Sequence, residues 1–252
     1  MSKPNGLRDH VAIVTGAAGG LGRATVELLH ALGASVVAED VVPGVESLGA
    51  LGDRVATVRG DVRERATADV AVARALEAFG GLDILVNNAA VILSKDILET
   101  SDAEWDDVMA VNVKGAFHHV RAALPHMLEQ GRGSIVNVTS ISGVVGLPKQ
   151  AAYCASKGAL VQMTRQLAIE YAGRGIRVIS VAPGAVDTPF LARHLDAQPD
   201  RAAAEADVRA AHPIGRYSAP AEIAETIAFL ASGASSFLTG TILMADGGYT
   251  AR

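Results

Sequence analysis

Two side chains in the middle of the chain, Tyr153 and Lys157, have the types and the spacing that proton transfer requires. Residues four apart lie on the same face of a helix, so these two would be neighbours. A free tyrosine titrates near pH 10, and a nearby ammonium group lowers its pKa by stabilising the phenolate. The pair predicts a general acid/base that takes a proton from an alcohol, or gives one to a carbonyl.

Ser140 is the third residue of this predicted catalytic set. It follows the apolar run at residues 135–138, at the carboxyl end of a predicted strand, where open α/β sheets bind ligands. Its hydroxyl can hydrogen-bond the substrate oxygen. A tyrosine and a lysine four apart are common by chance, and this pair gains weight by following a strand that ends in Ser140. Cys154 lies beside Tyr153 but is expected to have no role, because the other three residues already explain the site.

A glycine-rich turn near the N-terminus predicts a phosphate site. Residues 15–22 read Thr-Gly-Ala-Ala-Gly-Gly-Leu-Gly, between an apolar strand at 11–14 and a helical segment at 23–32. Glycines let the backbone approach a pyrophosphate, and the free N–H groups of the helix start point toward it. The predicted contacts are Gly16, Gly19, Gly20, Leu21 and Gly22.

Asp40, at the end of the second predicted strand, bears on the choice of cofactor. An acid about 20 residues after the glycine turn can accept hydrogen bonds from the ribose hydroxyls of the adenosine. It also repels a 2′-phosphate by about 1–4 kcal/mol at 4 Å, which favours NAD over NADP. Arg23 could attract that phosphate, but it lies in the first turn of the helix and carries less weight.

The elements that must position these residues follow from seven short apolar runs, most of them followed by a segment with helical spacing. This alternation predicts an α/β fold, a doubly wound Rossmann-type parallel sheet covered by helices on both faces. No linker or repeat interrupts it, so residues 1–252 are predicted to form a single domain. The predicted strands are residues 10–15, 35–38, 55–58, 83–86, 134–138, 176–181 and 241–244.

Three other segments carry specific predictions. The helix at 156–171 has apolar residues on more than one side, which indicates a partner subunit or else a wide stripe buried within one monomer. The uncharged stretch 226–245 has a polar middle and predicts a helix, a turn and a strand instead of a membrane span. Residues 187–213 predict short helices that act as a lid or as a static insertion, with Phe190 and Leu191 facing the substrate.

Composition and charge exclude several classes of protein. Half of the 252 residues are apolar (50%) and 19% are charged, which excludes a disordered chain. The net charge of −5 argues against nucleic-acid or membrane-surface partners. The seven histidines have no metal-ligand spacing, so no metal is predicted. A lone cysteine and the lack of an apolar signal core in residues 1–6 favour the cytoplasm.

Taken together, the motifs resemble the short-chain dehydrogenase/reductase family in its single-domain form, from residue 10 to residue 248. Ser140 precedes Tyr153 by 13 residues, the usual spacing in that family. The motifs that carry the resemblance are Thr15-Gly16 with Gly20-Leu21-Gly22, Asp61-Val62, Asn87-Asn88-Ala89, Asn112-Val113, Ser140, Tyr153 with Lys157, Pro183-Gly184 and Asp246-Gly247-Gly248.

The resemblance implies a role for each matching residue. Tyr153 would be the general acid/base, Lys157 would lower its pKa and hold the nicotinamide ribose, and Asn112 would support a water-linked proton relay. Asp40 matches the acid of NAD-preferring members. The further cofactor contacts implied are Asp61 and Val62 at adenine, Asn88 and Ala89 at the adenosine ribose, and Pro183, Gly184, Val186 and Thr188 at the nicotinamide. The predicted substrate contacts are Ser140, Ser142, Gln150, Tyr153 and Phe190.

Some positions depart from the family pattern. Ala90 replaces the usual glycine after Asn-Asn-Ala, and Gly19 stands where NADPH-using relatives often carry arginine. Relatives that reduce carrier-protein substrates often have basic residues at the positions of Gly131 and Ile169, and neither is basic here.

The sequence therefore predicts an NAD-dependent oxidoreductase that interconverts a secondary alcohol and a ketone, with a small-molecule substrate and a homotetrameric assembly. One alternative is an NADPH-dependent 3-oxoacyl carrier-protein reductase, which Asp40, Gly19 and the missing basic pair oppose. A second is a nucleotide-sensing regulator without activity, which the presence of Ser140 and Tyr153 opposes.

Overall fold

The computed structural model describes residues 6–251, and their seven strands form one fully parallel sheet. The order in the sheet is β3-β2-β1-β4-β5-β6-β7, which confirms the predicted doubly wound fold. The strands are β1 (Val11–Thr15), β2 (Ser35–Asp40), β3 (Val55–Arg59), β4 (Ile84–Asn87), β5 (Gly133–Val138), β6 (Ile176–Pro183) and β7 (Ile242–Ala245). Most of the polar N-terminal segment used in the localisation argument lies outside the described residues.

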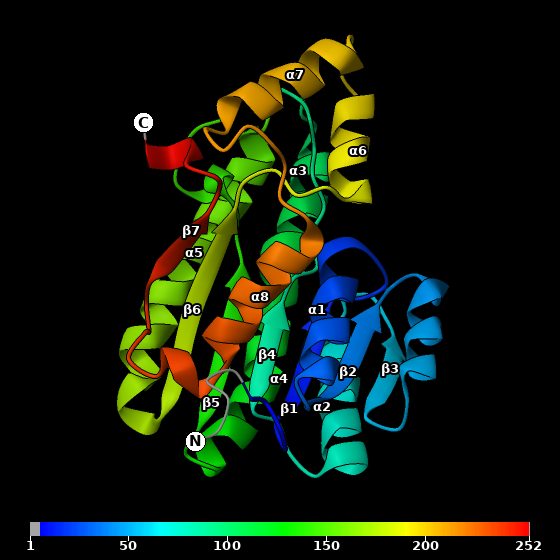
Figure 1. The fold of residues 1–252 in the computed structure, drawn as a ribbon, viewed down its shortest axis with the longest axis vertical. Coiled ribbons are helices and arrows are strands. Elements are labelled where there is room, and N and C mark those ends of the chain that lie inside the picture. Colours follow the sequence, from blue (N-terminus) through cyan, green and yellow to red (C-terminus); the bar gives the residue numbers. More distant parts are fainter. Residues whose placement is uncertain (1–5, 252) are drawn as a thin grey trace.

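Helices cover both faces of the sheet (Figure 1), with α1 and α8 toward the viewer and α2 and α4 behind. The helices are α1 (Gly20–Ala31), α2 (Arg65–Phe79), α3 (Asp102–Met109), α4 (Gly115–Glu129), α5 (Ala151–Tyr171), α6 (Pro189–Asp196), α7 (Arg201–Ala211) and α8 (Pro220–Ala231). Shorter helical turns connect several of them.

Alternation along each strand explains the two cores. In β1, Ala12 and Val14 pack into the cluster under α1 and α8, whereas Ile13 packs into the cluster under α2 and α4. All three side chains are fully buried. A strand buried on both faces needs a continuous apolar run, because successive side chains point to opposite sides of the sheet. The apolar runs in the sequence are therefore the direct cause of this three-layer arrangement.

The order of the strands reverses between β1 and β4, which run side by side in the middle of the sheet. Crossovers on the two sides of this point go to opposite faces, so a crevice opens above the carboxyl ends of these strands. Helices α6 and α7 lie over the same end of the sheet, at the top of Figure 1. The fold thus brings the glycine turn after β1 and Ser140 after β5 to one edge.

Several local predictions are confirmed. The stretch 226–245 comprises the end of α8, a turn and β7, and no helix within residues 6–251 is long and apolar enough to cross a bilayer. Ser101 forms a capping box at the start of α3, where its hydroxyl accepts from the Glu104 N–H. Helix α5 begins at Ala151, five residues before the predicted start, and so carries both Tyr153 and Lys157.

The insertion at 187–213 forms α6 and α7, as the short-helix prediction stated. Its two ends meet at one place, because Val186 and Ser218 form a parallel bridge. The Asp187 N–H donates to the Ser218 carbonyl at 2.9 Å, and the Ser218 N–H donates to the Ala185 carbonyl at 3.0 Å. The segment therefore leaves the scaffold and returns to it at a single hydrogen-bonded crossing.

Candidate active site

A cavity of about 1060 Å³ lies above the carboxyl ends of the strands and collects nearly all of the predicted site residues. Every predicted cofactor and substrate contact lines it, as do the predicted catalytic residues Ser140, Tyr153 and Lys157. Asn112 lies behind the wall, beside a small cavity of its own. A cavity of this size exceeds what one small substrate needs, and it can hold a dinucleotide and a substrate together.

The glycine turn is held in a shape that only glycine permits at two positions. Gly16 has a φ of +66°, and a Cβ there would lie 2.8 Å from the Ala89 Cα. A Cβ on Gly22 would lie 2.0 Å from the Gly16 carbonyl oxygen, so the first turn of α1 can only pack this closely without a side chain. The predicted cradle for a pyrophosphate therefore has a geometric basis.

Asn88 fastens this turn to the neighbouring strand end. Its side-chain amide donates to the carbonyls of Thr15 at 2.9 Å and Gly16 at 3.1 Å. The Thr15 hydroxyl in turn accepts from the backbone N–H groups of Asn88 and Ala89, both at 3.0 Å. The Asn88 side chain thus shapes the cavity wall in addition to the ribose contact that the sequence predicts.

Asp40 lines the cavity at the end of β2. Its carboxylate accepts the backbone N–H of Ala18 at 2.9 Å and that of Val42 at 3.1 Å. These bonds fix the carboxylate between the glycine turn and the loop after β2. Two acceptor sites on each carboxylate oxygen leave capacity for ribose hydroxyls.

Asp61, Arg63 and Asp107 form an ionic cluster that the sequence did not predict. Arg63 donates to both oxygens of Asp61, with the closest contact at 2.6 Å, and to Asp107 at 2.7 Å. The hydrogen bonds from Arg63 lower the pKa of the Asp61 carboxyl. Arg63 follows the Asp-Val pair by one position, but only the fold brings Asp107 of α3 into its reach. The cluster fixes the cavity wall at the predicted adenine end.

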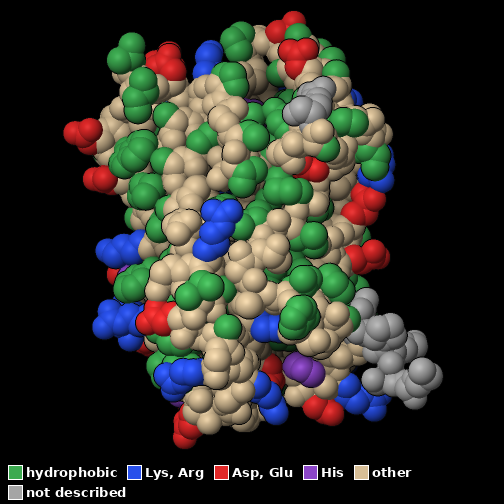
Figure 2. Space-filling view, turned by 90° about the vertical axis from the view of Figure 1, so that its left-hand side faces the viewer, with side chains coloured by type: hydrophobic (Ala, Val, Ile, Leu, Met, Phe, Trp, Pro, Cys, Tyr) green, Lys and Arg blue, Asp and Glu red, His purple; other side chains and the backbone are tan. Residues whose placement is uncertain are grey.

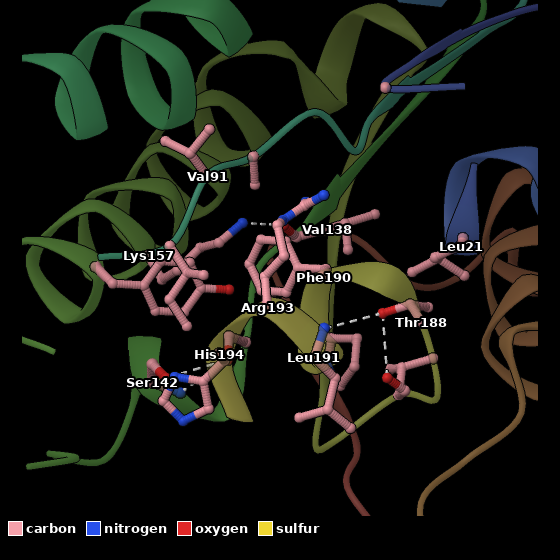
Figure 3. Close-up of a pocket in the computed structure, with 18 of the residues that line it drawn as sticks. Leu21, Val91, Val138, Ser142, Lys157, Thr188, Phe190, Leu191, Arg193 and His194 are labelled. Carbon is pink, nitrogen blue, oxygen red and sulfur yellow. Dashed lines mark hydrogen bonds between the residues drawn. The ribbon is translucent and has the colours of Figure 1, made fainter. Parts of the chain in front are cut away.

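Tyr153 and Lys157 lie on the same face of α5, as predicted, and both are almost fully buried. The Lys157 ammonium nitrogen lies 5.6 Å from the centre of the Tyr153 ring. It donates to the carbonyl of Val138 at 2.9 Å (Figure 3), which anchors it to the end of β5. The helix and the strand together place the two groups at the carboxyl edge of the sheet.

One electrostatic expectation is corrected. We expected Lys157 to lower the pKa of Tyr153, but burial dominates and raises the pKa of the phenol, while the hydrogen bond with Ser140 opposes this only in part. Burial also lowers the pKa of Lys157 to about 7. Both shifts have the same cause, since a low-dielectric surrounding disfavours the charged form of each group. These side chains alone therefore do not give a tyrosine that ionises near neutral pH.

Ser140 begins a chain of buried hydroxyl and amide groups. Its hydroxyl donates to the Ser142 hydroxyl at 3.2 Å, which donates to the side-chain oxygen of Gln150 at 3.2 Å. The Ser142 N–H also donates to the Ser140 hydroxyl oxygen at 3.1 Å. Ser142 and Gln150 line the cavity, yet their polar groups serve to orient Ser140.

Asn112 lies in a π-helical turn, Ala110–Lys114, between α3 and α4. Its side chain accepts the Val91 N–H at 2.8 Å and donates to the Val91 carbonyl and to the Ser156 hydroxyl. Such turns widen a helix locally and often occur at functional sites. These bonds tie the loop after β4 to α5, while the relay from Asn112 to Lys157 stays a prediction.

The α6 wall of the cavity carries Thr188 and Phe190. The Thr188 hydroxyl caps α6 by accepting the Leu191 N–H at 3.4 Å (Figure 3). The centre of the Phe190 ring lies 6.0 Å from that of Tyr153, which places an aromatic surface beside the reacting group. The prediction that Phe190 faces the substrate is consistent with this position.

Two histidines that the sequence did not single out hold the α6–α7 segment in place. His212 accepts the Ala185 N–H at 3.0 Å and bonds the Val208 carbonyl at 2.6 Å, so its ring joins the end of α7 to the end of β6. His194 of α6 is hydrogen-bonded to the Ser94 hydroxyl at 2.7 Å. Only the fold reveals the contacts with Ala185 and Ser94, because these partners lie 27 and 100 positions away in the chain.

Possible metal ligands and the lone cysteine were also predicted to have no part in the site. Among residues 6–251 no three histidine, cysteine or acidic side chains are grouped so that they could hold a metal ion. Cys154 is a free thiol, partly exposed, on α5.

Comparisons with known proteins identify the chain's relatives. A family model described as enoyl-(acyl carrier protein) reductase matches residues 16–250. The cis-4-hydroxycyclohexanecarboxylate dehydrogenase of Sinomonas cyclohexanicum is 44% identical, with 96% of this chain and 97% of the relative aligned. The 3-oxoacyl-(acyl-carrier-protein) reductase of Thermotoga maritima is 38% identical over 96% of this chain and 98% of its own. The crystal structure of levodione reductase superposes with a TM-score of 0.92 at 36% identity, covering 97% of this chain and 99% of that one.

Proposed function

The chain belongs to the short-chain dehydrogenase/reductase family and is an oxidoreductase of that family, and we propose that it oxidises a secondary alcohol with NAD. The observation that carries this proposal is the convergence of Ser140, Tyr153 and Lys157 on one cavity that also contains the glycine cradle. A nucleotide-sensing regulator would have no need for the catalytic set.

The residues present fit a dinucleotide. Glycines at positions 16 and 22 leave room that a Cβ would fill, and Gly19 has open space around it. The carboxylate of Asp40 and the backbone around Asp61 stand at the other end of the cavity, where an adenosine would lie. When bound, the nicotinamide ring supplies the hydride acceptor or donor.

The chain's own residues would handle the proton. The Ser142 N–H holds the Ser140 oxygen in place, and the one hydroxyl proton of Ser140 would turn from Ser142 to the substrate oxygen and orient that oxygen beside Tyr153. As a phenolate, Tyr153 would take the proton of the alcohol; as a phenol, it would give its own proton to the oxygen of the ketone. Lys157 stands beside that ring and, when charged, stabilises the phenolate.

We propose a ring-bearing secondary alcohol as the first substrate to test. The aromatic side chain of Phe190 beside Tyr153 suits an apolar ring, and a relative 44% identical is named for a hydroxycyclohexanecarboxylate. The experiment incubates the protein with NAD and cis-4-hydroxycyclohexanecarboxylate, cyclohexanol, a steroid alcohol or a sugar, and follows NADH absorbance. We expect NADH formation with the cyclohexane alcohols; NADH formation with none of the four substrates would contradict the proposal.

The second candidate is an NADPH-dependent 3-oxoacyl carrier-protein reductase, which the 38% identical relative favours. Asp40 disfavours a 2′-phosphate at the cofactor, and Gly131 and Ile169 offer no positive charge to a carrier protein. Comparing NADPH and NADH oxidation with an acetoacetyl thioester separates the two functions. Faster turnover with NADPH and the thioester than with NAD and the alcohols would reverse our preference.

We further propose a homotetramer that resides in the cytoplasm. Helices α4 and α5 expose Phe117 at 46% and Ile169 at 87% of their surfaces, which supports a second subunit against them. Figure 2 shows the side that carries β7 and α5, where hydrophobic side chains are spread over the centre and many charged ones lie around the rim. The unpaired thiol of Cys154 supports a reducing compartment.

A further inference from the structure

Some of the cationic side chains that line the cavity have hydrogen-bond or ionic partners, and others do not. Arg63 is neutralised by Asp61 and Asp107, and Lys157 is held by the Val138 carbonyl at the catalytic centre. Arg193 and Lys149 also line the cavity, and within residues 6–251 neither takes part in an ion pair or a side-chain hydrogen bond. Two cations in the substrate half of the pocket are therefore unexplained by the chemistry described so far.

Arg193 lies in the α6 wall of the pocket, and its side chain is exposed to solvent. It lies on α6, one turn after Phe190, whose ring is 6.0 Å from that of Tyr153. Figure 3 shows Phe190, Arg193 and His194 projecting into the pocket from this helix. A guanidinium there can reach a substrate group several bonds away from the alcohol carbon.

The helix that carries Arg193 is anchored on both sides of it. Thr188 caps its first turn, and His194 is hydrogen-bonded to Ser94 of the loop after β4. Burial lowers the pKa of His194, so its ring is neutral at pH 7 and acts as a polar anchor. Gln198 donates to the His194 carbonyl at 3.2 Å and supports the last turn. Arg193 is thus presented by a fixed element.

We propose that Arg193 binds an anionic group of the substrate, so that the preferred substrates are secondary alcohols carrying a carboxylate or a comparable anion. The inference rests on the proposed function and names the substrate class of the same site. A guanidinium recognises a carboxylate through two parallel hydrogen bonds, which fixes the orientation of the substrate as well as binding it. The apolar body of the substrate then lies along Phe190, with its alcohol at Ser140 and Tyr153.

Two other charged side chains, Lys149 and Asp207, line the same pocket and affect how strongly it attracts an anion. Lys149 enters from the loop before α5 and adds a second positive charge, while Asp207 of α7 lines the pocket without an ionic partner among the described residues. Asp207 repels an anion, so the attraction for an anionic group has to come from Arg193 and Lys149, of which Arg193 offers the planar guanidinium that pairs with a carboxylate. Replacing Asp207 by asparagine is expected to strengthen the binding of a carboxylate, and replacing Arg193 by glutamine to weaken it.

The first test measures binding without turnover. The protein with NADH is heated in the presence of cyclohexanecarboxylate or its neutral amide, and the rise in Tm is compared for wild type, Arg193→Gln and Arg74→Gln. Arg74 lies on α2 away from the cavity and controls for the loss of one charge. We expect the carboxylate to raise the Tm of wild type and Arg74→Gln, and not that of Arg193→Gln.

The second test measures specificity. We expect Arg193→Gln to lower kcat/KM for 4-hydroxycyclohexanecarboxylate by about tenfold, to leave the corresponding amide within about twofold, and to leave the KM for NAD unchanged. An equal response of wild type to the carboxylate and the amide in both tests would overturn the inference. So would a change confined to the KM for NAD, which would assign Arg193 to the cofactor. Binding of the carboxylate without any NAD-dependent oxidation would instead overturn the proposed function alone.

Discussion

At the scale of single residues, burial sets the chemistry of the site. Tyr153 and Lys157 are 6% and 2% exposed, and in each case burial shifts the pKa toward the neutral form. A buried phenol that holds its proton is a good donor to a ketone, and it needs a charge nearby to become a base. Three predictions concern individual side chains, and the first and third of them depend on this burial.

The first concerns the phenol. Tyr153→Phe is expected to lower kcat by about 10²-fold or more, because the proton donor and acceptor is lost while the ring is kept. Affinity for the cofactor, measured by fluorescence titration with NADH, should stay nearly unchanged. Turnover at the wild-type rate in this variant would refute the proposed mechanism.

The second concerns cofactor choice. Asp40→Ala is expected to reduce the ratio of kcat/KM for NAD to that for NADP by about tenfold, because it removes a carboxylate that repels a 2′-phosphate. The ratio is measured with one alcohol and both cofactors. Asp40→Asn, which keeps the shape but not the charge, should have a similar effect. If neither variant changes the NAD-to-NADP ratio of kcat/KM, another residue determines the cofactor preference.

The third concerns pH. The pKa of Lys157 is about 7 in the folded protein and 10.5 in a free side chain, so the unfolded state binds more protons between these values. Stability then rises with pH over this window, on the order of 1 kcal/mol per pH unit.

Urea unfolding at pH 7 and pH 9 tests this expectation. The free energy of unfolding of wild type should increase relative to that of Lys157→Met as the pH rises. Lys114→Met, at an exposed lysine, serves as the control and should follow wild type. Parallel pH dependence of wild type and Lys157→Met would show that the buried amine does not titrate in this range.

At the scale of elements, β2 and α4 are joined by a buried ion pair. Glu39 of β2 and His119 of α4 are 0% and 1% exposed, with 2.7 Å between the carboxylate and the ring nitrogen. The opposite ring nitrogen bonds the Gly115 carbonyl at 2.8 Å. Burial raises the pKa of Glu39, whereas the hydrogen bond and charge of Glu39 outweigh burial and raise the pKa of His119. Each of these two buried groups therefore relies on the other to stabilise its charged form.

Removing one member of this pair should therefore lower the stability of the folded protein. His119→Leu is expected to reduce the free energy of unfolding by about 3–5 kcal/mol, because it leaves Glu39 buried without a partner. The double variant Glu39→Leu with His119→Leu should lose clearly less, since no polar group is then left alone. Both are measured by urea denaturation. A double variant less stable than the single one would show that the pair itself, and not the orphaned acid, carries the stability.

The sequence predicted the positions of the strands but not the side-chain partners that join separate elements. The strands and the Ser140 position were predictable, because buried parallel strands need apolar runs such as Ile135–Val136 and end where polar residues begin. The Glu39–His119 pair was not, since it joins residues 80 positions apart in sequence. Nor was the Arg63–Asp107 contact, because it depends on the packing of α3 against the loop after β3. Local patterns locate the site, while side-chain partners depend on packing.

At the scale of the whole molecule, exposed apolar side chains on α4 and α5 predict self-association. Light scattering is expected to give the mass of a tetramer at micromolar concentration. Ile169→Asp should shift the population toward smaller species, because it places a charge in the apolar contact. Val70→Asp, at another exposed apolar position, on α2, serves as the control and should leave the mass unchanged. A wild-type monomer at this concentration would refute the proposed assembly.

The hydrogen-bonded crossing at Val186 and Ser218 has a consequence for how substrate choice can change. Because the α6–α7 segment departs from and rejoins the scaffold at one place, its length and contents can vary without altering the spacing of the strands. The segment could therefore be exchanged as one unit. Grafting residues 189–217 of another family member between Thr188 and Ser218 is expected to transfer substrate preference, measured as kcat/KM for the two parents' substrates, while the predicted cofactor contacts and the acid/base pair stay in the recipient.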